Sequence, residues 1–317
     1  MKSITVFVIT YNQEKVISRA LDSIPSQKDW GLFQIVIGDD ASTDNTFDVL
    51  CEYKSKYPEL LKVIRNNRNL GIFANLQNIV NNREDSDLYL FCSGDDEIGE
   101  GYFKSLQVFI KEKEIDISHA VGIFSDWAKK DPNGKEILVK QDLCKSNYDN
   151  WSLYIRGKIS PRSLALTKSV IDNFMPIDLS HGLLYAESQY DSQAFNIVKE
   201  TYYLPFRASV YYSGTGVSTK LNPRYSDYYT RQWKYKWNYY LNNFINNRKD
   251  YYYALYELTK ADFYINPTVK RYVKMYYYYI KGMLPNCHNS VKDDFWRFGA
   301  LFKYLIKYYG NPVDYMN

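Results

Sequence analysis

The N-terminal third of the chain alternates between short, continuous apolar runs and segments whose apolar residues recur at helical spacing. Residues 4–10 form a β-branched and aromatic run that is typical of a strand covered on both faces. Similar runs occupy residues 33–38, 61–64 and 88–92. Strands that alternate with helices in this way predict right-handed βαβ units and an open, mostly parallel sheet with helices on both faces.

Polar residues follow three of these predicted strands directly. They are Tyr11, Asn12, Asp39, Asp40, Asp95 and Asp96. Ligands of parallel α/β sheets bind beyond the carboxyl ends of the strands, so we expect these side chains to line one crevice. Adjacent carboxylates at the tip of a buried strand repel each other unless a cation neutralises them, which makes Asp95 and Asp96 candidate ligands of a divalent metal ion.

The middle of the chain is less regular. Its patterns predict helices at residues 101–113, 163–173 and 190–198, strands at 119–127 and 201–212, and a hairpin turn at 131–134 that returns through 137–139.

The composition changes at about Pro223, after which Tyr, Lys and Asn dominate and Gly and Pro are scarce. This predicts amphipathic helices appended to the sheet domain. We therefore divide the chain into a sheet domain, residues 1–222, and a helical, tyrosine-rich C-terminal extension, residues 223–317. Within the sheet domain, residues 1–125 and 126–222 form two halves.

Charge, cysteine content and missing motifs exclude several protein classes. A formal charge of +4 over 317 residues lacks the clustered basic excess of a nucleic-acid-binding protein. The four cysteines are scattered without a C-x-x-C pair, which argues against a disulfide scaffold or a structural zinc site and favours the cytoplasm. Neither a dinucleotide-binding nor a P-loop glycine motif is present. No run approaches the roughly 18 apolar residues of a membrane-spanning helix.

Four motifs in register resemble the nucleotide-sugar half of family-two glycosyltransferases with the GT-A fold. They lie at residues 6–12, 35–46, 69–71 and 93–96, and their order and spacing match over roughly the first 125 residues. The resemblance implies an α/β, Rossmann-like GT-A fold and an inverting, metal-dependent hexosyl transfer. It also implies a bacterial surface polysaccharide such as a capsule as the setting, with a glycan or lipid-linked glycan as acceptor.

The resemblance also implies contacts with a nucleotide-sugar donor, most simply a UDP-sugar. Asp40 would accept the imino proton of uracil, and Tyr11 would lie against the base. Asn69 and Gly71 match the loop that packs beside the nucleotide, with helix capping as an equally good interpretation.

At the fourth strand, the resemblance implies that Asp95 contacts the ribose and that Asp96 holds Mn²⁺ or Mg²⁺ between the two phosphates. Ser93 stands where many relatives have a third carboxylate, which leaves fewer charged ligands. Simpler interpretations exist for both acidic pairs. The pair at residues 39–40 would end a strand before a helix cap at Ser42 or Thr43, and the pair at 95–96 would cap a turn.

Inverting transfer also needs a base that takes the proton of the acceptor hydroxyl. In the family this base is a carboxylate at the start of a helix in the acceptor half, which corresponds here to residues 126–222. Glu187 and Asp191 are the two candidates, four residues apart. Asp191 is favoured because Ala194, Phe195 and Val198 follow it at the spacing of a packed helix.

Two functional alternatives stay open at this point. The tyrosine-rich helices either pack their rings on the sheet domain or a partner subunit of a homo-oligomer, or they contact the inner face of the cell membrane. For the latter, Lys270, Arg271, Lys274 and Lys281 interleave with apolar residues that include Met275. The rival to a transferase is a catalytically inactive nucleotide-sugar-binding or scaffold protein of a polysaccharide-assembly complex.

Overall fold

The structure is a computed structural model that describes residues 1–143, 147–214, 227–283 and 291–308. The chain divides into two compact units. Unit 1 contains residues 1–179 and 189–220, and unit 2 contains residues 180–188 and 221–317. The boundary expected between residues 222 and 223 lies outside the described residues and stays a prediction.

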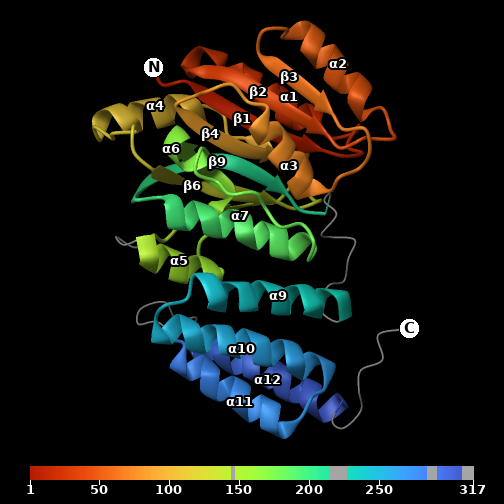
Figure 1. The fold of residues 1–317 in the computed structure, drawn as a ribbon, viewed down its shortest axis with the longest axis vertical. Helices are drawn as coiled ribbons and strands as arrows, with labels where there is room; N and C mark the ends of the chain where they lie inside the picture. The colour runs from red at the N-terminus through yellow and green to blue at the C-terminus, as the bar shows by residue number, and fades with distance from the viewer. Residues whose placement is uncertain (144–146, 215–226, 284–290, 309–317) are drawn as a thin grey trace. The chain divides into compact units, whose positions relative to one another are not determined.

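Four parallel strands form the first half of the sheet of unit 1, in the order β3-β2-β1-β4 (Figure 1). They are β1 (Ile4–Thr10), β2 (Leu32–Asp39), β3 (Leu61–Arg65) and β4 (Leu88–Ser93). The side chains of β1 are almost all buried, as expected for a strand covered on both faces. The structure thus confirms the parallel sheet, and β1 has the predicted limits.

The second half of the sheet is mixed, and it continues in the order β8-β6-β9-β5, with β7 paired to β6. The strands are β5 (Glu97–Ile98), β6 (Val121–Lys130), β7 (Glu136–Val139), β8 (Leu164–Thr167) and β9 (Glu200–Tyr212). β8 runs antiparallel to both β4 and β6, whereas β9 runs parallel to β6. The predicted hairpin is confirmed, because β6 and β7 pair antiparallel across the turn.

Helices cover both faces of the parallel strands. The helices and 3-10 turns of unit 1 are α1 (Ser18–Ser23), η1 (Pro25–Trp30), α2 (Thr46–Lys56), α3 (Ile72–Asn81), α4 (Tyr102–Glu112), α5 (Asn147–Ile155), η2 (Pro161–Ser163) and α6 (Lys168–Ile171). Leu21, Leu50 and Leu106 from α1, α2 and α4 share one core with Ile35 and Leu90 of the sheet. The long helix α7 (Leu183–Ile197) begins in unit 2 and ends in unit 1.

Two local predictions are wrong. The helix expected at residues 163–173 is instead η2, the strand β8 and the short helix α6. Leu164 and Leu166 are buried there in a strand between β4 and β6, so strand pairing prevails over helix propensity. Ser42 and Thr43 do not cap α2, which begins at Thr46.

The described residues of the C-terminal region form helices, as predicted for the tyrosine-rich extension, and these helices belong to unit 2. They are α9 (Asp227–Asn243), α10 (Arg248–Ile265), α11 (Val269–Lys281) and α12 (Val291–Tyr308). Helices α10, α11 and α12 pack together around a core that includes Phe263, Met275, Phe298 and Leu301 (Figure 1). The aromatic residues therefore build a core within unit 2. Across the described residues, we find no helix that combines the length and the apolar character needed to cross a membrane.

Candidate active site

The carboxyl ends of β1, β2 and β4 lie side by side, with β1 in the centre. The register places Ile9 beside Gly38 of β2 and Ser93 of β4. Asp40 N–H donates to Thr10 O at 3.0 Å, and Gly94 N–H donates to Ile9 O at 2.9 Å. Since neighbouring strands are about 4.8 Å apart, the ends of β2 and β4 lie about 10 Å from each other. The structure therefore brings the two predicted acidic pairs to one edge of the sheet.

Asp40 organises the loop that precedes α3. Its carboxylate is only 3% exposed. Oδ1 accepts hydrogen bonds from Asn66 Nδ2 at 2.9 Å and from Leu70 N–H at 2.8 Å, and Oδ2 accepts one from Gly71 N–H at 2.8 Å. A carboxylate has about four lone-pair sites, so these three bonds leave Oδ2 able to accept one more. Asp40 thus joins two of the predicted motifs and retains the acceptor capacity that a uracil imino group requires.

The loop itself depends on Gly71 and Asn69. Gly71 has φ +86°, which an L side chain rarely adopts, and it immediately precedes α3. Asn69 Oδ1 accepts a hydrogen bond from Gly71 N–H at 3.0 Å. Neither is a side-chain cap of α3, for which no cap hydrogen bond is present. Their direct contact with a nucleotide stays a prediction.

A chain of buried amides supports this loop from below. Asn66 Nδ2 donates to Asn75 Oδ1 at 3.0 Å, and Asn75 Nδ2 donates to Gly38 O at 2.8 Å. A Cβ at residue 38 would lie 2.3 Å from Asn75 Oδ1, so only glycine fits. The sequence analysis missed Asn66, because its partners become neighbours only when β2 and α3 pack together.

The loop after β1 is tied to the loop after β2. Asn12 has φ +51°, its N–H donates to Ser42 Oγ at 3.0 Å, and its Oδ1 accepts from Thr43 N–H at 2.8 Å. Ser42 and Thr43 therefore connect the two loops and do not cap α2. The neighbouring Tyr11 is 40% exposed, so its ring is available for stacking on a ligand.

Asp39 has a structural role, whereas Asp40 is the candidate binding residue of this pair. Asp39 is fully buried and pairs with Arg65 Nε at 3.3 Å. The guanidinium of Arg65 also lies 4.3 Å from the ring centroid of Phe47. Arg65 therefore holds the end of β2 in place, which favours a structural role over phosphate binding.

Asp96 is a buried carboxylate with two strong donors. It is 5% exposed, and its Oδ2 lies 3.1 Å from Arg162 Nη1, while Tyr212 N–H donates to Oδ1 at 3.0 Å. Burial raises the pKa of Asp96 to about 7, and the nearby Asp95 carboxylate adds to the rise, although Arg162 opposes it. The group therefore changes its charge close to neutral pH.

Two arginines border the acidic pair. The guanidinium of Arg162 lies 4.1 Å from the ring centroid of Tyr211, and that of Arg19 lies 4.1 Å from the ring centroid of Tyr212. Arg19 Nη1 also donates to Asp95 O at 3.4 Å. Aromatic stacking therefore holds both guanidinium groups beside the acidic pair. The sequence analysis missed both, because no local motif links either arginine to residues 95–96.

The acidic pair fits a divalent ion only as part of a larger ligand set. Within the described ranges, no three His, Cys, Asp or Glu side chains gather closely enough to hold a metal ion. Asp95 and Asp96 are both buried at the strand end. Mg²⁺ commonly binds through one or two carboxylates, with substrate phosphates and water completing its octahedron. The residues present therefore suit an ion that arrives with a diphosphate.

The predicted base Asp191 lies on α7, half-buried, and accepts a short hydrogen bond from Tyr154 Oη of α5. The adjacent Tyr190 packs edge-on against Phe91 of β4, with ring centroids 5.2 Å apart. This contact places α7 against β4 close to its carboxyl end. The side chain of Glu187 lies outside the described residues, so the choice between the two carboxylates stays open.

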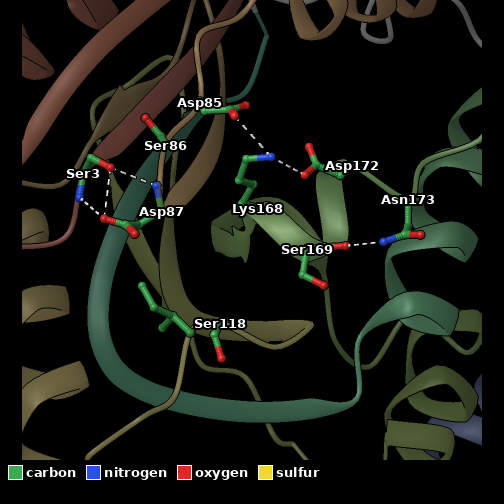
Figure 2. Close-up of a pocket in the computed structure, with 10 residues that line it drawn as sticks. Ser3, Asp85, Ser86, Asp87, Ser118, Lys168, Ser169, Asp172 and Asn173 are labelled. Carbon is green, nitrogen blue, oxygen red and sulfur yellow. Dashed lines mark hydrogen bonds and ion pairs between the residues drawn. The ribbon is translucent and has the colours of Figure 1, made fainter.

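A separate hollow of about 540 Å³ lies at the opposite edge of the sheet, before the starts of β1 and β4 (Figure 2). Its charged side chains are paired with one another or with Ser3. Lys168 Nζ lies 3.3 Å from Asp85 Oδ2 and also contacts Asp172, and Asp87 Oδ2 accepts from Ser3 N–H at 2.7 Å. We interpret this hollow as a structural polar contact between the segments before β1 and β4. The motifs predicted to bind the nucleotide sugar lie at the carboxyl ends of the strands, at the other edge of the sheet.

The family model for glycosyl transferase family 2 matches residues 5–168, just over half of the chain, and the chain belongs to this family. Among the relatives, an uncharacterized protein of Mycobacterium tuberculosis is 29% identical over 182 residues, which are 55% of this chain and 51% of that protein. The poly(ribitol-phosphate) β-N-acetylglucosaminyltransferase TarS of Staphylococcus aureus is 33% identical over 119 residues, which are 37% of this chain and 20% of TarS.

The fold is that of GT-A glycosyltransferases. The crystal structure of residues 1–349 of S. aureus TarS in complex with UDP-GlcNAc matches 87% of this chain and 79% of its own chain, with a TM-score of 0.58 at 19% identity. The chain spans about half the length of the first of the curated relatives that it matches. The fold class and the family predicted from the sequence are both confirmed.

Proposed function

We propose that this chain is a metal-dependent, inverting hexosyltransferase that uses a UDP-sugar donor and elongates a glycan or lipid-linked glycan of a bacterial surface polysaccharide, such as a capsule. One observation carries the proposal. Asp40, with a lone pair to spare, and Asp96, beside two stacked arginines, stand at the ends of strands that flank β1. A nucleoside diphosphate needs a base acceptor and a phosphate site at about this separation.

The candidate site residues at the strand ends each have a role in this proposal. Asp40 accepts the imino proton of uracil, and Tyr11 stacks on the base, beside the loop that contains Asn69 and Gly71. Asp95 contacts the ribose, and Asp96 holds Mn²⁺ or Mg²⁺. When bound, that ion neutralises charge that grows on the departing diphosphate.

Arg19 and Arg162 supply positive charge at the same place through protein side chains. Arg162 is paired with Asp96 at 3.1 Å and is about one-third exposed, so its guanidinium can also reach a phosphate group that lies beside Asp96.

The reaction is a single displacement. The acceptor hydroxyl attacks the anomeric carbon from the face opposite the diphosphate, the bond from that carbon to the diphosphate oxygen breaks, and a carboxylate on α7 takes the hydroxyl proton. Asp191 or Glu187 is that carboxylate. Tyr154 Oη donates a hydrogen bond to Asp191 Oδ2 and so orients this carboxylate on α7. Cytoplasmic location is part of the proposal, because the described cysteines Cys51 and Cys92 are free thiols.

A panel of nucleotide sugars with Mn²⁺ tests the proposal through the release of UDP. We expect release of UDP from at least one UDP-sugar, loss of this release in Asp96→Asn, and no release of GDP from the corresponding GDP-sugar. Release of UDP without any requirement for Asp96 would contradict it.

The rival, an inactive nucleotide-sugar-binding scaffold, is favoured by Ser93, which removes one charged ligand from the site. It predicts that calorimetry detects metal-dependent binding of UDP. It also predicts that no nucleotide-sugar donor is turned over when a mixture of glycan acceptors is supplied. Turnover of one donor excludes it.

A further inference from the structure

The helix α11 of unit 2 has an exposed apolar stripe opposite its buried face. Met275 and Tyr279 point into the core of unit 2, whereas five apolar or aromatic residues are about half exposed. These five are Val269, Val273, Tyr276, Tyr277 and Ile280. At 100° per residue they fall within an arc of about 100°, and they extend over about 16 Å of helix. Met275 thus belongs to the core and not to the apolar stripe in which the sequence analysis had placed it.

The stripe continues onto α12. The Phe302 ring lies 5.7 Å from that of Tyr272 on α11, and Tyr276 packs edge-on against Phe298 at 4.8 Å. Phe302 is 48% exposed and Ile306, one turn further along, is 67% exposed. We call the surface formed by Val269, Val273, Tyr276, Tyr277, Ile280, Phe302 and Ile306 the α11–α12 patch.

Lysines adjoin the apolar residues of the α11–α12 patch on both helices, and the patch itself contains no acidic residue. Five exposed lysines flank the apolar residues: Lys270, Lys274, Lys281, Lys303 and Lys307. Neither residues 269–281 nor residues 298–308 contain Asp or Glu. On the adjacent helix α10, Glu257 is buried against Lys260, and Asp262 is paired with Lys234. The patch therefore combines an apolar face with uncompensated cations.

We propose that the α11–α12 patch is a docking surface for a membrane that contains anionic phospholipids. Lysines along the sides attract acidic headgroups, and their alkyl stems allow the ammonium groups to stay in the headgroup layer. Tyrosines are favoured at the boundary between headgroups and acyl chains, while Val273, Ile280 and Ile306 enter its apolar side. A helix of 13 residues is about 20 Å long, so α11 lies in the surface and does not span the bilayer.

Vesicle binding by the full chain tests this proposal independently of any transferase activity. We expect the protein to co-sediment with vesicles of phosphatidylcholine and phosphatidylglycerol, and to remain in the supernatant with phosphatidylcholine alone. High salt should weaken the binding, because the lysines act through screened charges. Equal binding to both vesicle types, or binding to neither, would overturn the proposal.

Two double variants locate the surface. Val273→Glu with Ile280→Glu should weaken vesicle binding about tenfold or more, since two apolar side chains lose their favourable transfer and repel the headgroups. Val108→Glu with Ile137→Glu is the matched control, because these residues are similarly exposed but lie on α4 and β7 of unit 1. Circular dichroism and thermal melting establish that each variant is folded. Equal loss in both double variants would overturn the assignment.

Replacing lysines separates charge from apolar contact. Lys270→Gln, Lys274→Gln and Lys281→Gln should each weaken binding to the anionic vesicles about fivefold. Light scattering during size-exclusion chromatography distinguishes a second copy of the chain as the occupant. If the wild type is a dimer that Val273→Glu with Ile280→Glu converts to a monomer, with vesicle binding unchanged, the patch is a subunit interface and the membrane proposal is wrong.

Discussion

The role of Asp40 can be tested quantitatively by replacing it with alanine. The substitution removes three hydrogen bonds to a buried carboxylate, from Asn66, Leu70 and Gly71. Bonds to a charged group contribute about 1.5–3 kcal/mol each. Leu70 and Gly71 lie in a partly exposed loop where water can replace the lost acceptor, so we expect a total of about 3 kcal/mol. For a unit of this size, that corresponds to a melting temperature lower by about 6–12 °C.

Asp40→Asn is the matched control. It keeps Oδ1, which accepts from Asn66 and Leu70, and loses only the bond from Gly71, so we expect about a third of the destabilisation. Both variants should lose affinity for UDP, because alanine offers no acceptor to the imino group of uracil and the amide of asparagine presents a donor to it. Thermal unfolding by circular dichroism and titration calorimetry with UDP provide the two measurements. A wild-type melting temperature for Asp40→Ala, or unchanged UDP affinity in both variants, would refute the reasoning.

Three other predictions concern the base, the metal ligand and the packing of Gly38 below the loop that contains Asn69 and Gly71. Asp191→Asn should leave UDP binding intact and reduce transfer by about 100-fold or more; if Glu187→Gln alone has this effect, Glu187 is the base. The pKa of Asp96, about 7 in place of 3.8, means that the folded state holds a proton which the unfolded chain releases, so stability falls as pH rises from about 4 to 7. Thermal melting of the wild type should show this fall, Asp96→Asn should lack it, and Mn²⁺-dependent UDP binding by the wild type should strengthen as the pH rises through 7. Gly38→Ala, whose Cβ would clash with Asn75, should lower the free energy of unfolding in urea by about 1–3 kcal/mol, and wild-type stability would show that α3 can shift.

The sequence was sufficient for the parts of the fold that depend on local pattern. The continuous apolar run at residues 4–10 predicted both ends of β1 correctly. A strand that is buried on both faces is apolar along its whole length, so its limits coincide with those of the run. The four-residue strand β8 was predicted as helix. Its position depends on β4 and β6, which lie on either side of it and are distant in sequence, so no local pattern could reveal it.

The candidate site shows the same division. Asp40 and Asp96 were predicted as site residues because polar residues at the ends of parallel strands lie at one edge of the sheet. Arg162, which pairs with Asp96, is 66 residues away in sequence and lies in the 3-10 turn η2, which has no motif of its own. The acidic pair in the sequence indicated that a positive charge lies nearby. Only the packed structure shows that the Arg162 side chain supplies one such charge, in addition to any metal ion.

The most direct test of the central claim is calorimetric titration of UDP into the full chain, with and without Mn²⁺, for the wild type and for Asp96→Asn. If the carboxylates at the strand ends and a metal ion together hold the donor diphosphate, the wild type binds UDP more tightly with Mn²⁺ and the variant gains nothing from the ion. Equal enhancement by Mn²⁺ in both proteins, or no UDP binding by the wild type, would contradict the account.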